Sequence, residues 1–262
     1  MKSGNIAGSE LRHRALAMAG GFASAYAVPG LAFGLLGSDG VRISDGVGRL
    51  GGKGKPVGDT SVFHAASLSK ITTALLVAML NYRGALDLDH PVMQVLKGSL
   101  LASSPFGCVT LRQILSHTAG FPDVEDYAWG NTVADDGALG RYVETCAGSI
   151  PLFSPGCGFS YSNMGFEVAG HAASVVGNAT FEDLARIYVS EPLGMNDSTY
   201  FQPAVPASRA ALPHVLGARV RQHTPFPYHR VHAPSSTLQT TAVALLRDRK
   251  STRLNSSHGK LS

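Results

Sequence analysis

The sequence predicts a mixed α/β (α+β) fold, in which a sheet segment is followed by a buried helix and then by a helical region with long loops. Three observations lead to this prediction. Residues 28–63 contain short apolar stretches on either side of a turn, which is typical of paired strands. Residues 67–83 are apolar around nearly the whole helix surface. From residue 84 to about 247, helical patterns alternate with loops rich in Pro and Gly.

The sheet segment, about residues 24–63, is predicted from its apolar stretches and its turn. Residues 28–36 and 41–43 flank the turn Gly37-Ser38-Asp39-Gly40. Asp-Gly favours a hairpin because both residues tolerate the left-handed conformation. Residues 46–58 then form a Gly-rich stretch without a match to the phosphate-binding pattern GxxxxGK[ST], so we interpret them as a flexible connection.

The helix at 67–83 has apolar residues at helical spacing and further apolar residues on its opposite side, so we expect it to be buried. Gly84 follows it in the position that ends many helices. Residues 205–234 are rich in Pro and His and are expected to be irregular. Four further helices are predicted, at residues 110–115, 138–146, 164–176 and 181–188.

Composition excludes several classes of protein. The chain has 262 residues, of which 44% are apolar and 15% are charged, so it can bury a sizeable core and is not disordered. No apolar run approaches the roughly 20 residues of a membrane-spanning helix, so we expect no integral membrane span. The formal net charge is +4, and residues 248–262 carry +3 of it. The remainder is nearly neutral, which gives nucleic-acid binding no electrostatic support.

The cysteines and the N-terminus leave the compartment open. The three cysteines contain no CxxC pattern and allow at most one bridge, which excludes a disulfide framework. Arg12 and Arg14 precede a short apolar run at 15–19 that fits a weak export signal, but Glu10 and the glycines after the run fit a helix of the mature protein equally well. A periplasmic or secreted location and a cytoplasmic one both stay open, as does the oligomeric state.

A candidate nucleophile opens the predicted buried helix. Ser67 and Lys70 are three residues apart, so their side chains can approach each other on one helix face. The N-terminal end of the helix favours negative charge on the serine oxygen, and a nearby lysine amine can accept the serine proton. Ser69 points to the other side of the helix, and we expect it to be dispensable. The alternative is an N-cap serine with an unrelated lysine, because S-x-x-K is short and recurs at Ser257–Lys260.

Tyr161 and Asn163 form a second candidate pair, in a Gly- and Pro-rich loop just before a predicted helix. Tyr161-Ser162-Asn163 is the only Y-x-N in the chain. A phenol held beside a lysine can act as general base and then as general acid. The amide could bond the lysine or a substrate carbonyl. The alternative is a buried loop tyrosine followed by an asparagine that caps the helix.

Taken in order, Ser67-x-x-Lys70 and Tyr161-x-Asn163 resemble the serine β-lactamase and penicillin-binding protein superfamily. The chain is most similar to its class C-like branch, which includes D-alanyl-D-alanine carboxypeptidases and family VIII esterases. Longer segments carry the resemblance from about residue 24 to 247. They are Val28–Ala32, Leu86–Pro91 (similar to LDLDDPV), Leu115–Pro122 (similar to LSHTSGLP) and Glu191–Thr199 (similar to PLGMxDT).

The resemblance implies an antiparallel sheet flanked by helices, plus an all-helical region, with the site at their junction. Ser67 would be the acylated nucleophile, Lys70 its base partner, Tyr161 the proton carrier and Asn163 a hydrogen-bond partner of the lysine or substrate. The expected activity is a serine hydrolase without metal or cofactor, acting on a β-lactam, a D-amino-acid peptide or a small ester. The alternative is a non-catalytic binding or scaffold relative, or an inactive fragment of such an enzyme.

The chain departs from the superfamily at its end. The third motif, K-[ST]-G or H-x-G, should lie on a strand downstream of Y-x-N, but residues 201–247 hold no match, and Lys2-Ser3-Gly4 stands on the wrong side of Ser67. Residues 248–262 resemble a translated sequencing adapter, so we expect a non-native tail after one incomplete domain over 12–247. A chain without that strand lacks one oxyanion donor, and we expect it to be inactive and poorly folded.

The remaining candidates are interpreted as structural. His223, His229 and His232 lack Cys or acidic partners at zinc spacing and are expected at the surface. His64 and His117 are expected to satisfy backbone groups. Cys157 is near Tyr161 in sequence, but no arrangement with a base is evident that would activate it, so no nucleophile is expected there.

Overall fold

The computed structural model describes residues 3–37, 40, 42–52, 54–130, 135–217 and 219–247. In that part of the chain the labelled helices are α1 (Ser3–Ala25), α2 (Ser69–Tyr82), α3 (Leu111–Leu115), α4 (Ala138–Thr145), α5 (Asn163–Gly177), α6 (Phe181–Ala185) and α7 (Ala233–Ser236), and residues 242–247 are also helical. The strands are β1 (Gly30–Leu36), β2 (Arg42–Gly48), β3 (Phe63–His64), β4 (His214–Leu216), β5 (Val220–Gln222) and β6 (Gln239–Thr240). The tail 248–262, two residues of the expected turn, Ser38 and Asp39, and Lys2 of the K-S-G match lie outside the described residues.

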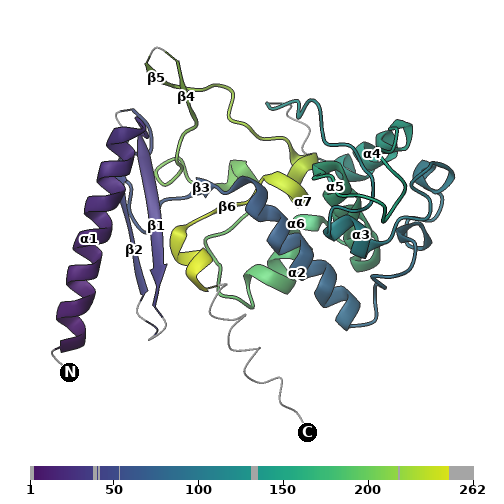
Figure 1. Ribbon diagram of the computed structural model, residues 1–262, viewed down its shortest axis with the longest axis horizontal. Coiled ribbons are helices and arrows are strands. Elements are labelled where there is room, and N and C mark those ends of the chain that lie inside the picture. The colour runs from purple at the N-terminus through teal and green to yellow at the C-terminus, as the bar shows by residue number, and fades with distance from the viewer. Residues whose placement is uncertain are drawn as a thin grey trace, which may run out of the picture.

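The predicted hairpin is confirmed as β1 and β2, whereas residues 24–25 at the start of the predicted sheet segment belong to α1. Strands β1 and β2 pair antiparallel in a register that sets Gly30 opposite Gly48 and Leu36 opposite Arg42. Helix α1 lies along this hairpin at one end of the molecule (Figure 1). The other described strands also pair antiparallel, β3 with β6 and β4 with β5, so the mixed helix and sheet architecture agrees with the expected fold class.

The long N-terminal helix includes the apolar run at 15–19. Arg12 of α1 binds Asp45 of β2 through its guanidinium, with an N–O distance of 2.5 Å, although the arginine is largely exposed. Such a surface pair adds little stability. Among the helices that the structure describes, none combines the length and the apolar character needed to cross a bilayer.

The helical region begins and ends its helices where the sequence supplies caps. Thr110 and Gln113 form a reciprocal capping box at the start of α3. The Ser162 hydroxyl accepts the Gly165 N–H at the start of α5, and Asn178 ends that helix in the left-handed conformation. The four predicted helices at 110–115, 138–146, 164–176 and 181–188 therefore correspond to α3, α4, α5 and α6.

Helix α2 is not buried on every side, as its composition suggested. One face is buried in the main core, which also receives side chains from α3, α5 and α6. The opposite face exposes Ile71, Met79 and Tyr82, with Tyr82 87% exposed. Apolar composition indicates what a helix is able to bury, but it does not state which face the rest of the chain covers.

Residues 205–234 are more ordered than predicted. They contain the β4–β5 hairpin, a short 3₁₀ turn at Arg230–His232 and the start of α7. Helix α7 lies between α2 and α5 (Figure 1). The Thr73 hydroxyl of α2 donates to the Pro234 carbonyl at 2.6 Å. On the other side, Gly170 of α5 lies so close to Pro234 that only a hydrogen fits between them.

This contact between α5 and α7 generates a stability prediction. A methyl group at Gly170 would overlap Pro234 and lie 2.6 Å from its Cβ, whereas a methyl group at Gly21 of α1 meets nothing within 4 Å. We expect Gly170→Ala to destabilise the chain by about 1–3 kcal/mol through overpacking. Gly21→Ala, the matched helical control, should stabilise it by about 0.5–1 kcal/mol. Urea unfolding of both variants measures this, and a stable Gly170→Ala would contradict the packing.

Candidate active site

Ser67 lies in a 3₁₀ turn, Ala66–Leu68, directly before α2, and it is exposed to solvent. The preceding residue, Ala66, has a φ of 46°, a strained conformation for a residue with a side chain. The Ser69 hydroxyl donates to the Ala66 carbonyl at 2.7 Å and accepts the Leu238 N–H at 2.9 Å. Ser69 is fully buried and holds the turn, so it has a structural role, while its dispensability for catalysis stays a prediction.

Lys70 is the residue on which the site converges. Its side chain is buried, and its amine donates to the Asn163 amide oxygen, to the Ser235 carbonyl at 2.9 Å and to Ser67 Oγ at 3.4 Å. The amine also lies 4.7 Å from the centre of the Tyr161 ring, within reach of a cation–π interaction. The approach of Ser67 and Lys70 that the spacing predicted is therefore present.

Tyr161 lies on the open side of Ser67. Its phenol donates to Ser67 Oγ at 2.9 Å, and its ring is 41% exposed, so it is not the buried loop tyrosine of the alternative. The ring packs on His117, with 4.5 Å between ring centres. His117 Nδ1 accepts the Ser162 N–H at 3.1 Å, which fixes the backbone between Tyr161 and α5. This confirms that His117 satisfies a backbone group.

Asn163 is a hydrogen-bonding centre rather than a helix cap, since the cap of α5 is Ser162. The amide nitrogen of Asn163 donates to Asp123 at 2.8 Å and to the Tyr127 hydroxyl, and its oxygen accepts from Lys70. Asp123 also accepts the Asn163 backbone N–H at 2.8 Å. These donor bonds fix which side of the amide faces Lys70.

The surroundings of the site favour uncharged side chains beside the lysine. Burial, and to a smaller extent the Lys70 ammonium, lower the pKa of His117 below 6.5. Burial, with Asp123 and Glu167 adding to it, raises the pKa of Tyr127 to about 12. Both shifts favour the neutral forms of these two side chains.

The structure corrects the interpretation of the C-terminal histidines. His229 and His232 are buried instead of lying at the surface, and His232 Nδ1 lies 3.1 Å from a Glu167 oxygen. His64, as expected, contacts a backbone group, the Ser236 carbonyl, at 2.5 Å. Within the described residues, no group of three or more His, Cys, Asp or Glu side chains is arranged to hold a metal ion. The cysteines are free thiols: Cys108, Cys146 and Cys157.

Sequence reasoning missed the residues that come from distant segments. Ser235 of α7 supplies its carbonyl to Lys70, and Asp123 and Tyr127 hold Asn163, although no local motif marks any of them. The sequence did offer one signal for Ser235, a run of polar residues between apolar ones in segment 231–240. The structure buries this whole segment. Buried polar residues are hydrogen-bonded and often belong to a site.

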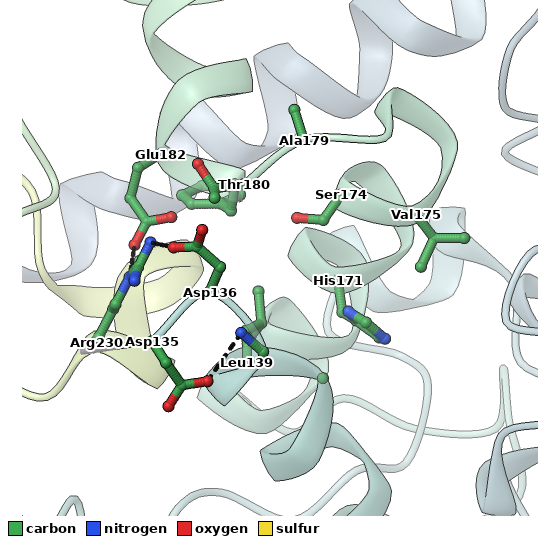
Figure 2. Close-up of a pocket in the computed structure, with 14 residues that line it drawn as sticks. Asp135, Asp136, Leu139, His171, Ser174, Val175, Ala179, Thr180, Glu182 and Arg230 are labelled. Carbon is green, nitrogen blue, oxygen red and sulfur yellow. Dashed lines mark hydrogen bonds and ion pairs between the residues drawn. The ribbon is translucent and has the colours of Figure 1, made fainter. Parts of the chain in front are cut away.

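A separate pocket of about 340 Å³ lies away from these residues, between α4, α5 and α6. Figure 2 shows the Arg230 guanidinium between the carboxylates of Glu182 and Asp136, each 2.8 Å away, with His171 on the opposite wall. None of Ser67, Lys70, Tyr161 and Asn163 lines it. The pocket therefore does not contribute to the candidate site.

Comparisons with known proteins found a family model and several relatives that this chain resembles. The Beta-lactamase family model matches residues 15–255. Penicillin-binding protein 4 of Amycolatopsis lactamdurans is 32% identical over 165 residues, 63% of this chain and 42% of that protein. Esterase EstB of Burkholderia gladioli is 32% identical over 159 residues, 55% of this chain and 40% of the esterase. The matched segments thus span less than half of these curated relatives.

A solved structure shows the same fold. The D-alanine carboxypeptidase AmpC of Burkholderia cenocepacia superposes with a TM-score of 0.70 and 28% identity, over 86% of this chain and 59% of that one. The family match ends at residue 255, eight residues into the segment 248–262 that the sequence assigns to a tail.

The bonds of Ser69 generate a prediction for the site. Ser69→Ala leaves the buried Leu238 N–H without its acceptor and frees the strained Ala66 carbonyl, so we expect a loss of about 1–3 kcal/mol in unfolding free energy. Ser116→Ala, which removes an exposed serine, should change it by less than about 0.5 kcal/mol. Urea unfolding compares the two. Equal stability of Ser69→Ala and the wild type would show that Ser69 does not hold the turn.

Proposed function

The chain belongs to the β-lactamase family, and we propose that it carries the nucleophilic centre of a serine hydrolase that forms an acyl-enzyme at Ser67. One observation carries this proposal. An exposed serine oxygen lies 2.9 Å from a phenol oxygen and 3.4 Å from a buried lysine amine. A serine with two proton-handling groups in reach is the arrangement that nucleophilic catalysis requires.

Ser67 would attack the substrate carbonyl through Oγ. A bond forms between Oγ and the carbonyl carbon, and the hydroxyl proton passes either to Tyr161, once that phenol has given up its own proton and is a phenolate, or to Lys70, once that amine is unprotonated. When the bond to the leaving nitrogen or oxygen breaks, the same group returns the proton to it. Water then hydrolyses the acyl-enzyme by the reverse sequence of proton transfers.

Asn163 would hold Lys70 in place during this cycle. Its oxygen orients the Lys70 amine, and its nitrogen is already committed to Asp123 and Tyr127. The amide cannot rotate without breaking those bonds, so it keeps Lys70 directed at Ser67. A contact between Asn163 and substrate would require one of these bonds to exchange.

The substrate class follows from the chemistry and the relatives together. The relatives include penicillin-binding proteins, an esterase and a protein named as a D-alanine carboxypeptidase. β-Lactams, D-amino-acid peptides and small esters all present a carbonyl with a nitrogen or oxygen leaving group, so one nucleophile can serve all of them. We propose a small acyl compound or peptide of this kind as substrate.

Covalent labelling tests the nucleophile. A fluorophosphonate requires one attack and no hydrolysis, so labelling reports the activation of Ser67 apart from turnover. The described residues already bring Lys70 and Tyr161 to Ser67, so we expect labelling even though the missing third motif predicted an inactive chain. The label should be one per chain, mapped by peptide mass spectrometry to Ser67 and absent in Ser67→Ala. Tyr161→Phe should label about 10²-fold more slowly, while Tyr82→Phe, which alters an exposed tyrosine, should label normally.

Three outcomes of this experiment would contradict the proposal. They are a label on another residue, labelling that survives in Ser67→Ala, and no labelling of the wild type. Competition by benzylpenicillin, by an acyl-D-alanyl-D-alanine peptide and by a short-chain ester then ranks the three substrate classes, since each blocks Ser67 in proportion to its acylation.

A further inference from the structure

Glu167 is a fully buried carboxyl group one helical turn beyond Asn163 on α5. Its Oε1 accepts the Ser235 hydroxyl at 2.5 Å and lies 3.1 Å from His232 Nδ1. An ionised Glu167 only accepts, so in that form the pair requires a proton on His232 Nδ1. Among the residues that the structure describes, Oε2 of Glu167 has no hydrogen-bond partner.

Stability does not explain this carboxyl group. Burial raises the pKa of Glu167, and the bonds from His232 and Ser235 offset the rise only in part. An acidic group buried with one oxygen unpaired is destabilising, and apolar residues often replace buried charged pairs without loss. The presence of Glu167 in a core helix is therefore explained by its contacts with other side chains and not by a gain in stability.

Ser235 connects Glu167 to the nucleophile. Its hydroxyl is bound to Glu167, while its backbone carbonyl accepts the Lys70 amine at 2.9 Å. The Ser235 hydroxyl also lies 2.8 Å from the Ser236 hydroxyl, which in turn lies 3.5 Å from the Asn163 amide oxygen. The position of one residue on α7 thus sets an acceptor of Lys70, and Glu167 holds that residue.

His232, the partner of Glu167, contacts a residue that holds Asn163. It is buried and packs edge to face against Tyr127, with 4.9 Å between ring centres, and Tyr127 accepts a bond from Asn163. Besides Ser67, Lys70 has two acceptors among the described residues, the Ser235 carbonyl and the Asn163 amide oxygen. Glu167 reaches the first through the Ser235 hydroxyl, and His232 reaches the second through Tyr127.

We propose that the Glu167–His232 pair is a positioning pair, which fixes the Ser235 carbonyl and thereby holds the Lys70 amine at Ser67. This inference rests on the proposed function, since it assigns the pair to the activation of that serine. Neither residue touches Ser67, so the pair acts through Ser235 and not on substrate.

Two variants remove different parts of the link. Glu167→Gln keeps an oxygen acceptor and the shape of the side chain but removes the charge, and Ser235→Ala removes the hydroxyl while keeping the carbonyl that accepts from Lys70. The matched controls are Glu182→Gln, a carboxylate bound to Arg230 outside the site, and Ser174→Ala, a hydroxyl of α5 bound to a backbone carbonyl.

The readout is fluorophosphonate labelling of Ser67, measured over a range of concentrations so that the maximal rate and the half-saturating concentration separate, together with the thermal midpoint. We expect both variants to lower the maximal rate by about 10-fold or more, because small displacements of a catalytic group have large effects on rate. The half-saturating concentration should change less than about 2-fold, since binding is untouched. Glu167→Gln should melt at or above the wild-type temperature.

The double variant adds a second criterion. If Glu167 acts through Ser235, Glu167→Gln with Ser235→Ala should label no more slowly than the slower single variant. Wild-type maximal rates in both single variants, or rate losses that the controls share, would overturn the positioning role while leaving the proposed function intact. Absence of labelling in the wild type would overturn the proposed function and this role with it.

Discussion

A buried ammonium group requires acceptors, and Lys70 obtains them from three separate parts of the chain. The turn before α2 supplies Ser67, α5 supplies Asn163 and α7 supplies the Ser235 carbonyl. Burial of a charged amine without such partners would destabilise the chain by several kcal/mol, about the total stability of a small domain. The three segments must therefore meet at one point, and the site is the consequence of that requirement.

The packing around Lys70 makes this meeting point rigid. Helix α7 is held by Thr73 of α2 on one side and by the close approach of Gly170 on the other. Ser69 ties the strained turn at Ala66 to the segment after α7. The nucleophile is thus exposed, but the residues that orient it belong to the core.

Local patterns in the sequence were sufficient for the parts of the site that lie close together along the chain. The spacing of Ser67 and Lys70 predicted their approach, and the first hairpin, the buried helix and the four later helices lie close to the predicted ranges. The acceptors from other segments were not predictable in this way, since Asn163 and Ser235 lie 93 and 165 residues from Lys70. The resemblance to a known family identified the first of these, and no motif identified the second.

Two errors in the prediction have a common physical origin. Apolar spacing suggested that α2 is buried throughout, and polar composition suggested that His229 and His232 are exposed. The type of a side chain sets its preference for water or for the core. Whether it is buried depends on which segments of the folded chain cover it. His232 is buried because Glu167 offers it a partner in the core, a contact between residues 65 positions apart.

The central claim is that Lys70 is fixed at Ser67 by acceptors from α5 and α7. A high-resolution crystal structure of the chain with a phosphonate bound to Ser67 tests it most directly. The account predicts a bond from Oγ to phosphorus, with the Lys70 amine still bonded to the Asn163 oxygen and the Ser235 carbonyl. A Lys70 side chain turned to solvent, or an α7 displaced from α2 while Ser67 is modified, would contradict it.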